Sequence, residues 1–153
     1  MHKVFVVGIT GMLGSTLLKT LANNNQLKIY GSSRNSNQIN AHRALSYEHI
    51  GGLDILDEHK LFNQLNVIKP DTIINCVGVI KQIKGAQHPL DIIPINSLFP
   101  HKLEKFCNSK NIRLIHISTD CVFSGRKGNY TEIDISDAED LYGKSKYIGE
   151  VYG

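Results

Sequence analysis

Residues that could hold a metal or build a disulfide framework are scarce in this sequence. Its 153 residues include three cysteines, Cys76, Cys107 and Cys121, and none belongs to a Cys-x-x-Cys pair. The seven histidines are spread singly, without a His-x-x-x-His pair. Each cysteine lies within an apolar run, so we predict three reduced, buried thiols. No metal site is predicted.

Clustered positive charge and long apolar runs are absent as well. The 17 basic and 14 acidic residues leave a net charge of +3, and the basic ones are scattered along the chain. A nucleic-acid face would cluster them, whereas a weak positive field suits an anionic cofactor and substrate. The apolar run before Gly8 is too short for a signal peptide, and no run reaches transmembrane length. We therefore expect a cytoplasmic protein with neither nucleic acid nor membrane as a partner.

Apolar runs of strand length alternate with segments of helical period, which is typical of an α/β fold with a parallel sheet. Asp57 is predicted to cap a helix. Residues 92–109 are predicted to be mainly helical, with Pro94 near the start and a kink at Pro100. The predicted strands are 3–7, 27–31, 49–53, 71–77 and 112–118, and further helices are predicted from about residues 12 and 139.

This pattern predicts a Rossmann-type, doubly wound parallel sheet, formed by one domain over residues 1–153, and the three glycines that follow the first strand indicate that this is an NAD(P)-binding domain. A complete enzyme of this kind would need a sixth strand and a pocket for its substrate. Neither is predicted within the sequence. The domain is therefore expected to be incomplete, without the later strands and the substrate-binding part.

A glycine-rich turn, Gly-Ile-Thr-Gly-Met-Leu-Gly, joins the first predicted strand to the first helix. Gly8 permits a tight turn, Gly11 lets backbone N–H groups approach a pyrophosphate, and Gly14 lets the helix pack close to the sheet. The helix N-terminus adds N–H donors and a favourable dipole for the anion. The spacing Gly-x-x-Gly-x-x-Gly is similar to that of the short-chain dehydrogenases/reductases. The residues predicted to line the cofactor here are Gly8, Thr10, Gly11, Met12, Leu13 and Gly14.

The second predicted strand leads into Ser32, Ser33 and Arg34. An NAD site usually carries an acidic residue at this position for the ribose 2′-hydroxyl, and none is present. The serines offer hydroxyl groups, and Arg34 can pair with a 2′-phosphate through charge-assisted hydrogen bonds. These residues favour NADP(H) over NAD(H) as the cofactor, with a solvated loop arginine as the alternative interpretation of Arg34.

Tyr142 and Lys146 stand four residues apart, so they face the same side of the last predicted helix. A phenol has a pKa of about 10 and is a poor acid near neutrality, but a nearby ammonium lowers that pKa. A Tyr-x-x-x-Lys pair alone is usually a helix surface. Here it follows Thr119 at the end of the fifth predicted strand, and ligands bind outside the carboxyl ends of strands in open α/β sheets. We therefore predict Thr119, Tyr142 and Lys146 as the catalytic residues.

These segments resemble the extended short-chain dehydrogenases/reductases, and residues 115–150 resemble the dTDP-4-dehydrorhamnose reductase group most closely. The stretch contains Ser-Thr-Asp-Cys-Val-Phe-Ser-Gly from Ser118, Tyr-Thr-Glu from Tyr130, the Tyr-x-x-x-Lys helix and a final Gly149-Glu150. One departure is Cys121, where those reductases usually carry tyrosine. Sugar-nucleotide 4,6-dehydratases carry Thr-Asp-Glu at this point, so this chain lacks the glutamate that elimination needs.

The resemblance implies further cofactor contacts. Asn96 matches the family's helix asparagine, which supports the lysine through its backbone and a water molecule. Asp54 and Ile55 match the pair that the family places at the adenine ring. After the fourth predicted strand, Cys76, Val77 and Gly78 stand where the family has an Ala-Ala-Gly turn, with bulkier side chains.

The function that the resemblance implies is NADP(H)-dependent reduction of a nucleotide-linked 4-keto-6-deoxysugar, in deoxysugar and cell-surface polysaccharide biosynthesis. Thr119 would orient the substrate carbonyl, Tyr142 would give a proton to its oxygen, and Lys146 would also bind the nicotinamide ribose. Two alternatives stay open: an NAD-dependent sugar-nucleotide epimerase and a non-catalytic NADP-binding regulatory module. A homodimer is left open as well.

Overall fold

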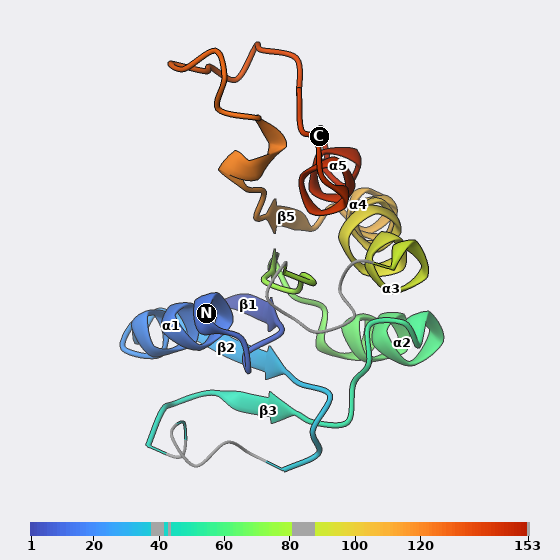
Figure 1. Cartoon of the computed structure of the whole chain (residues 1–153). Helices are drawn as coiled ribbons and strands as arrows, with labels where there is room; N and C mark the ends of the chain where they lie inside the picture. Colours follow the sequence, from blue (N-terminus) through green and yellow to red (C-terminus); the bar gives the residue numbers. More distant parts are fainter. Residues whose placement is uncertain (38–41, 43, 81–87, 153) are drawn as a thin grey trace. The chain divides into compact units, whose positions relative to one another are not determined.

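The computed structural model of the chain describes residues 1–37, 42, 44–80 and 88–152 (Figure 1). These residues belong to two compact units. The first unit holds the whole sheet, and the second holds the helix with the Tyr-x-x-x-Lys pair. The first unit comprises Met1–Val77 and Leu103–Ile117, and the second comprises Gly78–Lys102 and Ser118–Gly153.

The first unit is built on a five-stranded parallel sheet in the order β3-β2-β1-β4-β5. This is the strand order of the Rossmann fold, with the first strand at the centre and connections to both sides. The α/β fold predicted from the sequence is therefore confirmed. The strands are β1 (His2–Val7), β2 (Leu27–Ser32), β3 (Glu48–Ile50), β4 (Thr72–Asn75) and β5 (Arg113–His116).

The carboxyl ends of these strands lie in register. Val7 pairs with Ser32 on one side and with Asn75 on the other. Ser32 pairs in turn with Ile50, and Asn75 pairs with His116. Residues that follow these positions emerge along one edge of the sheet, which is the edge where ligands bind in open α/β folds.

One face of the sheet packs against α1 (Met12–Leu21). Side chains alternate along a strand, so Val4 and Val6 of β1 point to the same face. They form a buried cluster with Leu18 of α1. Burying an apolar side chain of this size contributes roughly 1.5–3 kcal/mol, so this cluster holds α1 and the turn before it firmly on the sheet.

The second helix of the first unit, α2 (Glu58–Ile68), begins where the sequence predicts. The side chain of Asp57 accepts a hydrogen bond from the Lys60 N–H at 3.0 Å. This satisfies one of the N–H groups that the first turn of a helix leaves without an intrahelical partner. The buried side chains of α2 are Leu61, Leu65 and Ile68.

Three of the strands end earlier than the sequence predicts. The third stops at Ile50 instead of Leu53, the fourth at Asn75 instead of Val77, and the fifth at His116 instead of Ser118. At Asn75 the cause is local, because its side-chain oxygen accepts a hydrogen bond from the Val77 N–H at 3.1 Å. Asparagine commonly turns the chain in this way, so the end of β4 is explained by the residue type at position 75.

The helix predicted over residues 92–109 begins earlier and contains a wider turn. It starts with α3 (Pro89–Ile93), passes through a π-helical turn, η2 (Pro94–Leu98), and continues as α4 (Phe99–Lys110). The prediction that Pro94 stands at the start of the helix is therefore wrong. Proline is tolerated in the first turn because its missing N–H is not needed there, and this role belongs to the proline that begins α3.

The irregularity predicted at Pro100 occurs just before it. In η2 the N–H of Phe99 bonds the carbonyl of Pro94, five residues back. Pro100 has no N–H to give to the carbonyl of Asn96, and its ring would clash with that carbonyl in a regular α-helix. A wider turn relieves this conflict.

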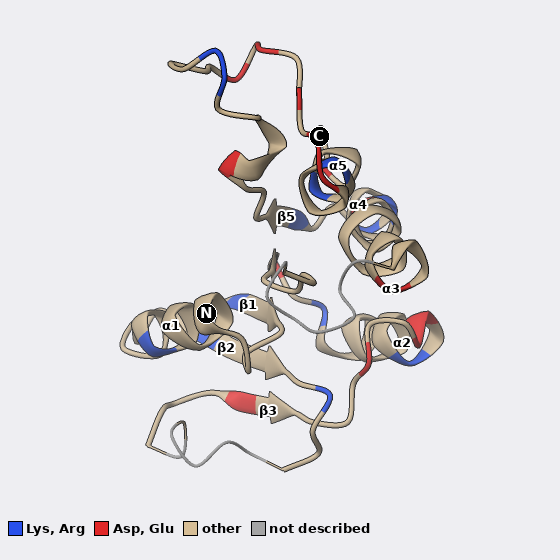
Figure 2. Cartoon of the chain, in the orientation of Figure 1, with Lys and Arg blue, Asp and Glu red and all other residues tan. Residues whose placement is uncertain are grey.

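The second unit also contains a 3₁₀ turn, η3 (Asp120–Val122), and α5 (Leu141–Ile148), which are joined by an irregular loop over residues 124–139. Charges of both signs are interspersed on α2, on α4 and in this loop (Figure 2). Within the described residues, no helix combines the length and the apolar character needed to cross a membrane.

All three cysteines carry free thiols. Cys107 is buried as predicted, whereas Cys76 and Cys121 are only half-buried, because both lie in turns after strands and not inside them. Burial raises the pKa of the Cys76 and Cys107 thiols to about 11. Among the residues that the structure describes, no group of three or more His, Cys, Asp or Glu side chains could hold a metal ion.

Candidate cofactor and catalytic sites

The glycine turn after β1 contains two glycines that the fold itself requires. Gly8 has a left-handed φ of +87°, and a Cβ there would lie 2.6 Å from Cγ2 of Val77. Gly14 is buried, and a Cβ there would overlap the carbonyl oxygen of Gly8. Both positions need glycine so that α1 can approach the strands closely, whatever the turn binds.

Gly11 differs, because nothing in the fold requires its lack of a side chain. It has an ordinary extended backbone, with φ −74° and ψ 163°, and a Cβ would meet only the Gly8 carbonyl oxygen, at 3.7 Å. Gly11 precedes α1, whose first turn has neither a side-chain cap nor an acidic residue. The helix dipole and its first N–H groups can therefore serve an anion in the space that a side chain on Gly11 would fill.

The other residues predicted in this turn are accessible. Thr10 is exposed, and so are Met12 and Leu13 at the start of α1. Their exposure agrees with a surface that a ligand could cover.

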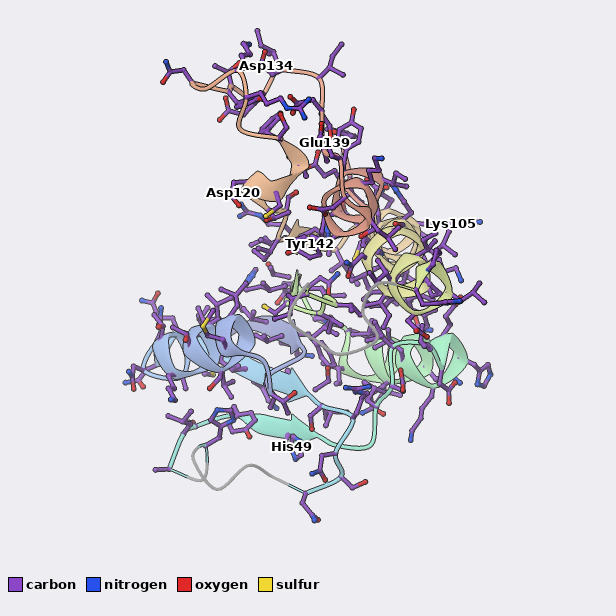
Figure 3. All side chains as sticks on the ribbon, in the orientation of Figure 1. His49, Lys105, Asp120, Asp134, Glu139 and Tyr142 are labelled. Atoms are coloured by element: carbon purple, nitrogen blue, oxygen red, sulfur yellow. The ribbon has the colours of Figure 1, made fainter. Side chains whose placement is uncertain are left out.

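After β2, two buried serines are followed by an exposed arginine. Ser32 is 2% exposed and Ser33 is 4% exposed, whereas Arg34 is exposed. The Ser33 hydroxyl donates to the Asn35 carbonyl at 2.7 Å and lies 2.8 Å from Nε2 of His49. A hydroxyl has one proton, so the His49 ring (Figure 3) is the donor to Ser33. The Ser33 hydroxyl is thus used inside the protein, and Arg34 is the accessible member of the three predicted residues.

The other predicted strand-end residues make local contacts. The carboxylate of Asp54 accepts a hydrogen bond from the Leu56 N–H at 2.9 Å, and Ile55 is 6% exposed in the core. Cys76 and Val77 are half-buried after β4. The positions of these four residues are explained by the fold alone. The predicted roles of Asp54 and Ile55 at the adenine ring, and of Cys76 and Val77 beside the cofactor, therefore stay predictions.

In the second unit, buried Asn96 connects α5 with the segment that follows β4. Its Oδ1 accepts a hydrogen bond from the Val79 N–H at 2.8 Å, and its Nδ2 donates to the Val79 carbonyl at 2.9 Å. The same Nδ2 donates to the Ser145 hydroxyl at 3.1 Å. A Cβ on neighbouring Gly78 would lie 3.5 Å from Oδ1, an ordinary contact. Asn96 therefore clamps the backbone beside Gly78 to the helix of Lys146, while its predicted support of the lysine itself stays a prediction.

Thr119 follows β5, which ends at His116 and not at Ser118 as predicted. Thr119 caps η3, because its Oγ1 accepts a hydrogen bond from the Cys121 N–H at 3.2 Å. Its hydroxyl proton points to the Asp120 carboxylate at 3.3 Å. That second contact is long for an O–H···O bond, so the proton could be redirected to another acceptor.

The first turn of α5 packs directly on η3. Asp140 caps this helix by accepting a hydrogen bond from the Gly143 N–H at 2.8 Å. Gly143 is buried, and a Cβ there would overlap the carbonyl oxygen of Cys121. Only glycine allows this approach, which brings Tyr142 beside the turn that follows the strand end; Figure 3 shows Tyr142 on α5 and Asp120 on η3.

The predicted catalytic residues thus lie on two elements that contact each other, Thr119 at η3 and Tyr142 with Lys146 on α5. Tyr142 is half-buried and Lys146 is 4% exposed. Burial lowers the pKa of Lys146, and the Glu150 carboxylate partly opposes this effect. Tyr142 and Lys146 thus lie one helical turn apart on α5, and their catalytic roles stay predictions.

The loop between η3 and α5 is held by its own side chains. Asp137 accepts hydrogen bonds from the Ser124 hydroxyl at 2.6 Å, the Ser124 N–H at 2.7 Å and the Tyr130 hydroxyl at 2.8 Å. These bonds lower the pKa of Asp137 to about 2. Tyr130 also stacks on Phe123, with ring centroids 4.4 Å apart. An anchored loop fixes the chain shortly before the helix that carries Tyr142.

Sequence reasoning missed several small residues that position this helix. The Ser97 hydroxyl donates to the Ser145 carbonyl at 2.8 Å, and a Cβ on Gly149 would overlap the carbonyl oxygen of Asn96. Gly143 has the equivalent role at the other end of α5. The signal was available, because glycine and serine inside or beside a Tyr-x-x-x-Lys helix allow close approach of neighbouring backbone.

The fold and these segments define a class of protein. A parallel sheet in Rossmann order, glycines at spacings of three and three after its first strand, and a Tyr-x-x-x-Lys helix are features of the extended short-chain dehydrogenases/reductases. Within that class, the chain belongs to the RmlD substrate binding domain family, whose model matches residues 1–152.

Two similar proteins are named as reductases. The probable low-salt glycan biosynthesis reductase Agl14 of Haloferax volcanii is 30% identical over 149 residues, which cover 95% of this chain and 47% of the relative. The dTDP-4-dehydrorhamnose reductase of Aggregatibacter actinomycetemcomitans is 28% identical over 151 residues, or 98% of this chain and 46% of the relative. The chain thus spans about half the length of these relatives, and its resemblance to the reductase group is confirmed.

A third relative has a different kind of name. Methionine adenosyltransferase 2 subunit beta of Bos taurus is 27% identical over 149 residues, which cover 97% of this chain and 42% of the relative. Among solved structures, a hypothetical dTDP-4-dehydrorhamnose reductase from Sulfolobus tokodaii is 27% identical with a TM-score of 0.78, over 97% of this chain and 50% of that chain. Similarity therefore extends from named reductases to a protein named as a subunit of another enzyme.

Proposed function

We propose that this chain is the dinucleotide-binding part of an NADP(H)-dependent reductase of a nucleotide-linked 4-keto-6-deoxysugar. The observation that carries the proposal is the close packing of α5 on η3 through Gly143, which puts Tyr142 and Thr119 on adjoining elements. The relatives that are named as reductases support the substrate class. One of these relatives is named for a dTDP-linked dehydrorhamnose as its substrate.

The first unit fits the pyrophosphate of a dinucleotide. Gly11 leaves space beside an uncapped helix N-terminus, and this space is lost with any side chain at that position. Arg34 is exposed after β2 with no acidic residue from Ser32 to Asn37, which supports a 2′-phosphate and hence NADP(H). When bound, the reduced nicotinamide supplies the hydride.

The side chains of the second unit would act on the substrate carbonyl. The Thr119 hydroxyl would exchange its long contact with Asp120 for a hydrogen bond to the carbonyl oxygen, which orients and polarises the carbonyl. Tyr142 would donate its phenolic proton to the same oxygen. Buried Lys146 would stabilise the resulting phenolate and bind the nicotinamide ribose.

Turnover tests this proposal. NADPH oxidation is followed by absorbance with a dTDP-linked 4-keto-6-deoxysugar, for the 153-residue chain and for the longest product of its gene. General acid catalysis contributes about 10²–10⁴-fold, so Tyr142→Phe should lower kcat by that factor and leave NADPH affinity near normal. Full activity in the Tyr142→Phe variant would contradict the assigned mechanism.

A second candidate function is a cofactor-binding subunit without turnover. The similarity to a protein named as subunit beta of methionine adenosyltransferase favours it. Such a subunit would need the glycine turn but not the phenol. Tight NADPH binding without turnover of any nucleotide-linked ketosugar, unchanged in Tyr142→Phe, would decide for this function and against the reductase.

A further inference from the structure

The segments that follow β2 and β3 stay hydrogen-bonded to each other beyond the end of the sheet. The Leu53 N–H donates to the Ser33 carbonyl at 2.9 Å, and the Gly52 N–H donates to the Asn35 carbonyl at 3.3 Å. Arg34 stands between these two bonds in the sequence, so its backbone lies beside the segment after β3. All of these residues belong to the first unit. The surroundings of Arg34 therefore follow from fixed contacts.

Gly52 lies close to a hydroxyl and to an ammonium that come from different segments. Its φ of +67° is left-handed, a backbone conformation that favours glycine. A Cβ at this position would lie 3.1 Å from the Ser36 hydroxyl oxygen and 3.8 Å from Nζ of Lys60. The loop after β2 and the first turn of α2 thus each bring a hydrogen-bond donor to one point beside Gly52, which has no side chain to fill it.

The Lys60 ammonium is oriented but keeps donors for a ligand. Its Nζ donates to the Gly52 carbonyl at 2.6 Å. An ammonium has three N–H donors, and this bond uses one of them. The carboxylate of Asp57 accepts the Lys60 backbone N–H at 3.0 Å, as the cap of α2. Among the residues that the structure describes, Lys60 forms no ion pair, so no carboxylate neutralises its charge.

We propose that Lys60 and Ser36 bind the 2′-phosphate of NADP(H) together with Arg34, and that Lys60 is a specificity-determining residue for the cofactor. The proposal rests on the proposed function for the identity of the cofactor. In a Rossmann fold the ribose that carries this phosphate lies just past the second strand, where Ser36 and Gly52 stand. A phosphate monoester has a charge of about −1.5 to −2 and three acceptor oxygens, so it takes donors from several side chains at once.

A purely structural role of Lys60 gives a different expectation. Its bond to the Gly52 carbonyl ties the start of α2 to the segment after β3, and loss of this tie alone would weaken every ligand of the site equally. A contact with the 2′-phosphate strengthens only those ligands that carry the phosphate. Adenosine 2′,5′-bisphosphate and adenosine 5′-monophosphate differ in this group alone, and neither contains the nicotinamide. The ratio of their affinities therefore separates the two roles.

Titration of the chain with both nucleotides, followed by NMR chemical shifts, measures this ratio. In Lys60→Met the preference for the bisphosphate should fall about 5- to 10-fold, the loss of one charge-assisted hydrogen bond at an exposed site, and in Ser36→Ala it should fall about 2- to 5-fold. Lys60→Arg keeps the charge and should keep most of the preference. Lys105→Met is the matched control, because Lys105 (Figure 3) is an exposed lysine of α4 in the same unit, and it should leave the ratio unchanged.

An unchanged ratio in folded Lys60→Met overturns the proposal, and so does an equal loss of affinity for both nucleotides. If that variant does not fold, Lys60→Gln keeps an N–H donor for the Gly52 carbonyl and removes the charge, and an unchanged ratio there overturns the proposal equally.

Turnover separates this proposal from the proposed function. A chain that prefers the bisphosphate, loses this preference in Lys60→Met and reduces no nucleotide-linked ketosugar refutes the proposed reductase and supports the phosphate site. Reduction of the ketosugar with NADPH, together with an unchanged ratio in Lys60→Met, refutes the role of Lys60 and leaves the proposed function standing.

Discussion

Substitution of Gly11 by alanine and substitution of Gly14 by alanine should damage different properties, although both residues belong to one glycine turn. At Gly11 a Cβ meets only the Gly8 carbonyl oxygen at 3.7 Å, and the backbone conformation suits any residue. At Gly14 a Cβ would overlap that same carbonyl oxygen, which belongs to the backbone and cannot move aside easily. Gly11→Ala should therefore damage binding of the cofactor, and Gly14→Ala should damage the fold.

The expected magnitudes follow from these contacts. For Gly11→Ala, the reduced entropy of the unfolded chain stabilises by about 0.4–1 kcal/mol, and the loss of a good N-cap residue costs a similar amount, about 1 kcal/mol. The free energy of unfolding should stay within about 1 kcal/mol of wild type. Loss of one charge-assisted bond to the pyrophosphate costs roughly 1.5–3 kcal/mol, so NADPH should bind roughly 10- to 150-fold more weakly.

For Gly14→Ala, forcing an extra group into a packed contact costs typically 1–3 kcal/mol, as an approximate range. At about 2–4 °C per kcal/mol for a chain of this length, Tm should fall by roughly 2–12 °C. NADPH fluorescence titration measures the affinity and a thermal melt measures Tm on the same samples. Wild-type affinity in Gly11→Ala, or a wild-type Tm in Gly14→Ala, would refute the division of roles between the two glycines.

Three further predictions concern other parts of the chain. Arg34→Ala should weaken NADPH binding by about 1–3 kcal/mol, the value of a charge-assisted contact, and leave NADH binding unchanged. Calorimetric titration with both cofactors measures the two affinities, and an equal loss of NADH affinity would exclude a 2′-phosphate contact. With pKa values of about 11, only about one in a thousand of the Cys76 and Cys107 thiols is a thiolate at pH 8. Mass spectrometry after brief alkylation should therefore find Cys121 modified first. Early modification of buried Cys107 would contradict the packing. Asp137 has a pKa of about 2 in the folded chain and about 3.9 in the unfolded chain. A carboxyl group whose pKa is lowered by folding stabilises the folded state at pH values above its unfolded pKa. This contribution is lost as the pH falls through about 2. NMR signals of Ser124 and Tyr130 should therefore keep their hydrogen-bonded positions at pH 3 and lose them near pH 2, and loss already at pH 4 would refute the anchor.

Much of the first unit could be predicted because its signals are local. The β-branched run before Gly8 and the cap at Asp57 act through neighbours in sequence, and both occur as predicted. The boundaries at Ile50 and Asn75 were less accessible, because a strand ends where its partner ends or where a side chain captures the backbone. Strand pairing of this kind depends on residues far apart in the chain.

The candidate site was predictable in residue types and less so in contacts. Tyr142 and Lys146 follow from their spacing, but the contact of the Ser33 hydroxyl with His49 depends on the neighbouring strand β3. The same holds for Glu150, whose partner Ser118 is 32 residues away in sequence. Long-range hydrogen bonds leave no periodicity in a sequence, and that is why these residues escaped prediction.

The π-helical turn η2 has a consequence for how this helix tolerates changes in length. Each residue of an α-helix advances about 100° around the axis, and a π-helical turn holds one residue more than an α-helical turn. Asn96 and Ser97, whose side chains both bind Ser145, lie inside this widened turn. Deleting one residue within η2 would restore a regular turn and rotate α3 by about a quarter of a circle relative to α4. The extra residue therefore sets the rotation of the side chains of α3 relative to those of α4. The length of η2 is under tighter constraint than the identity of most of its side chains.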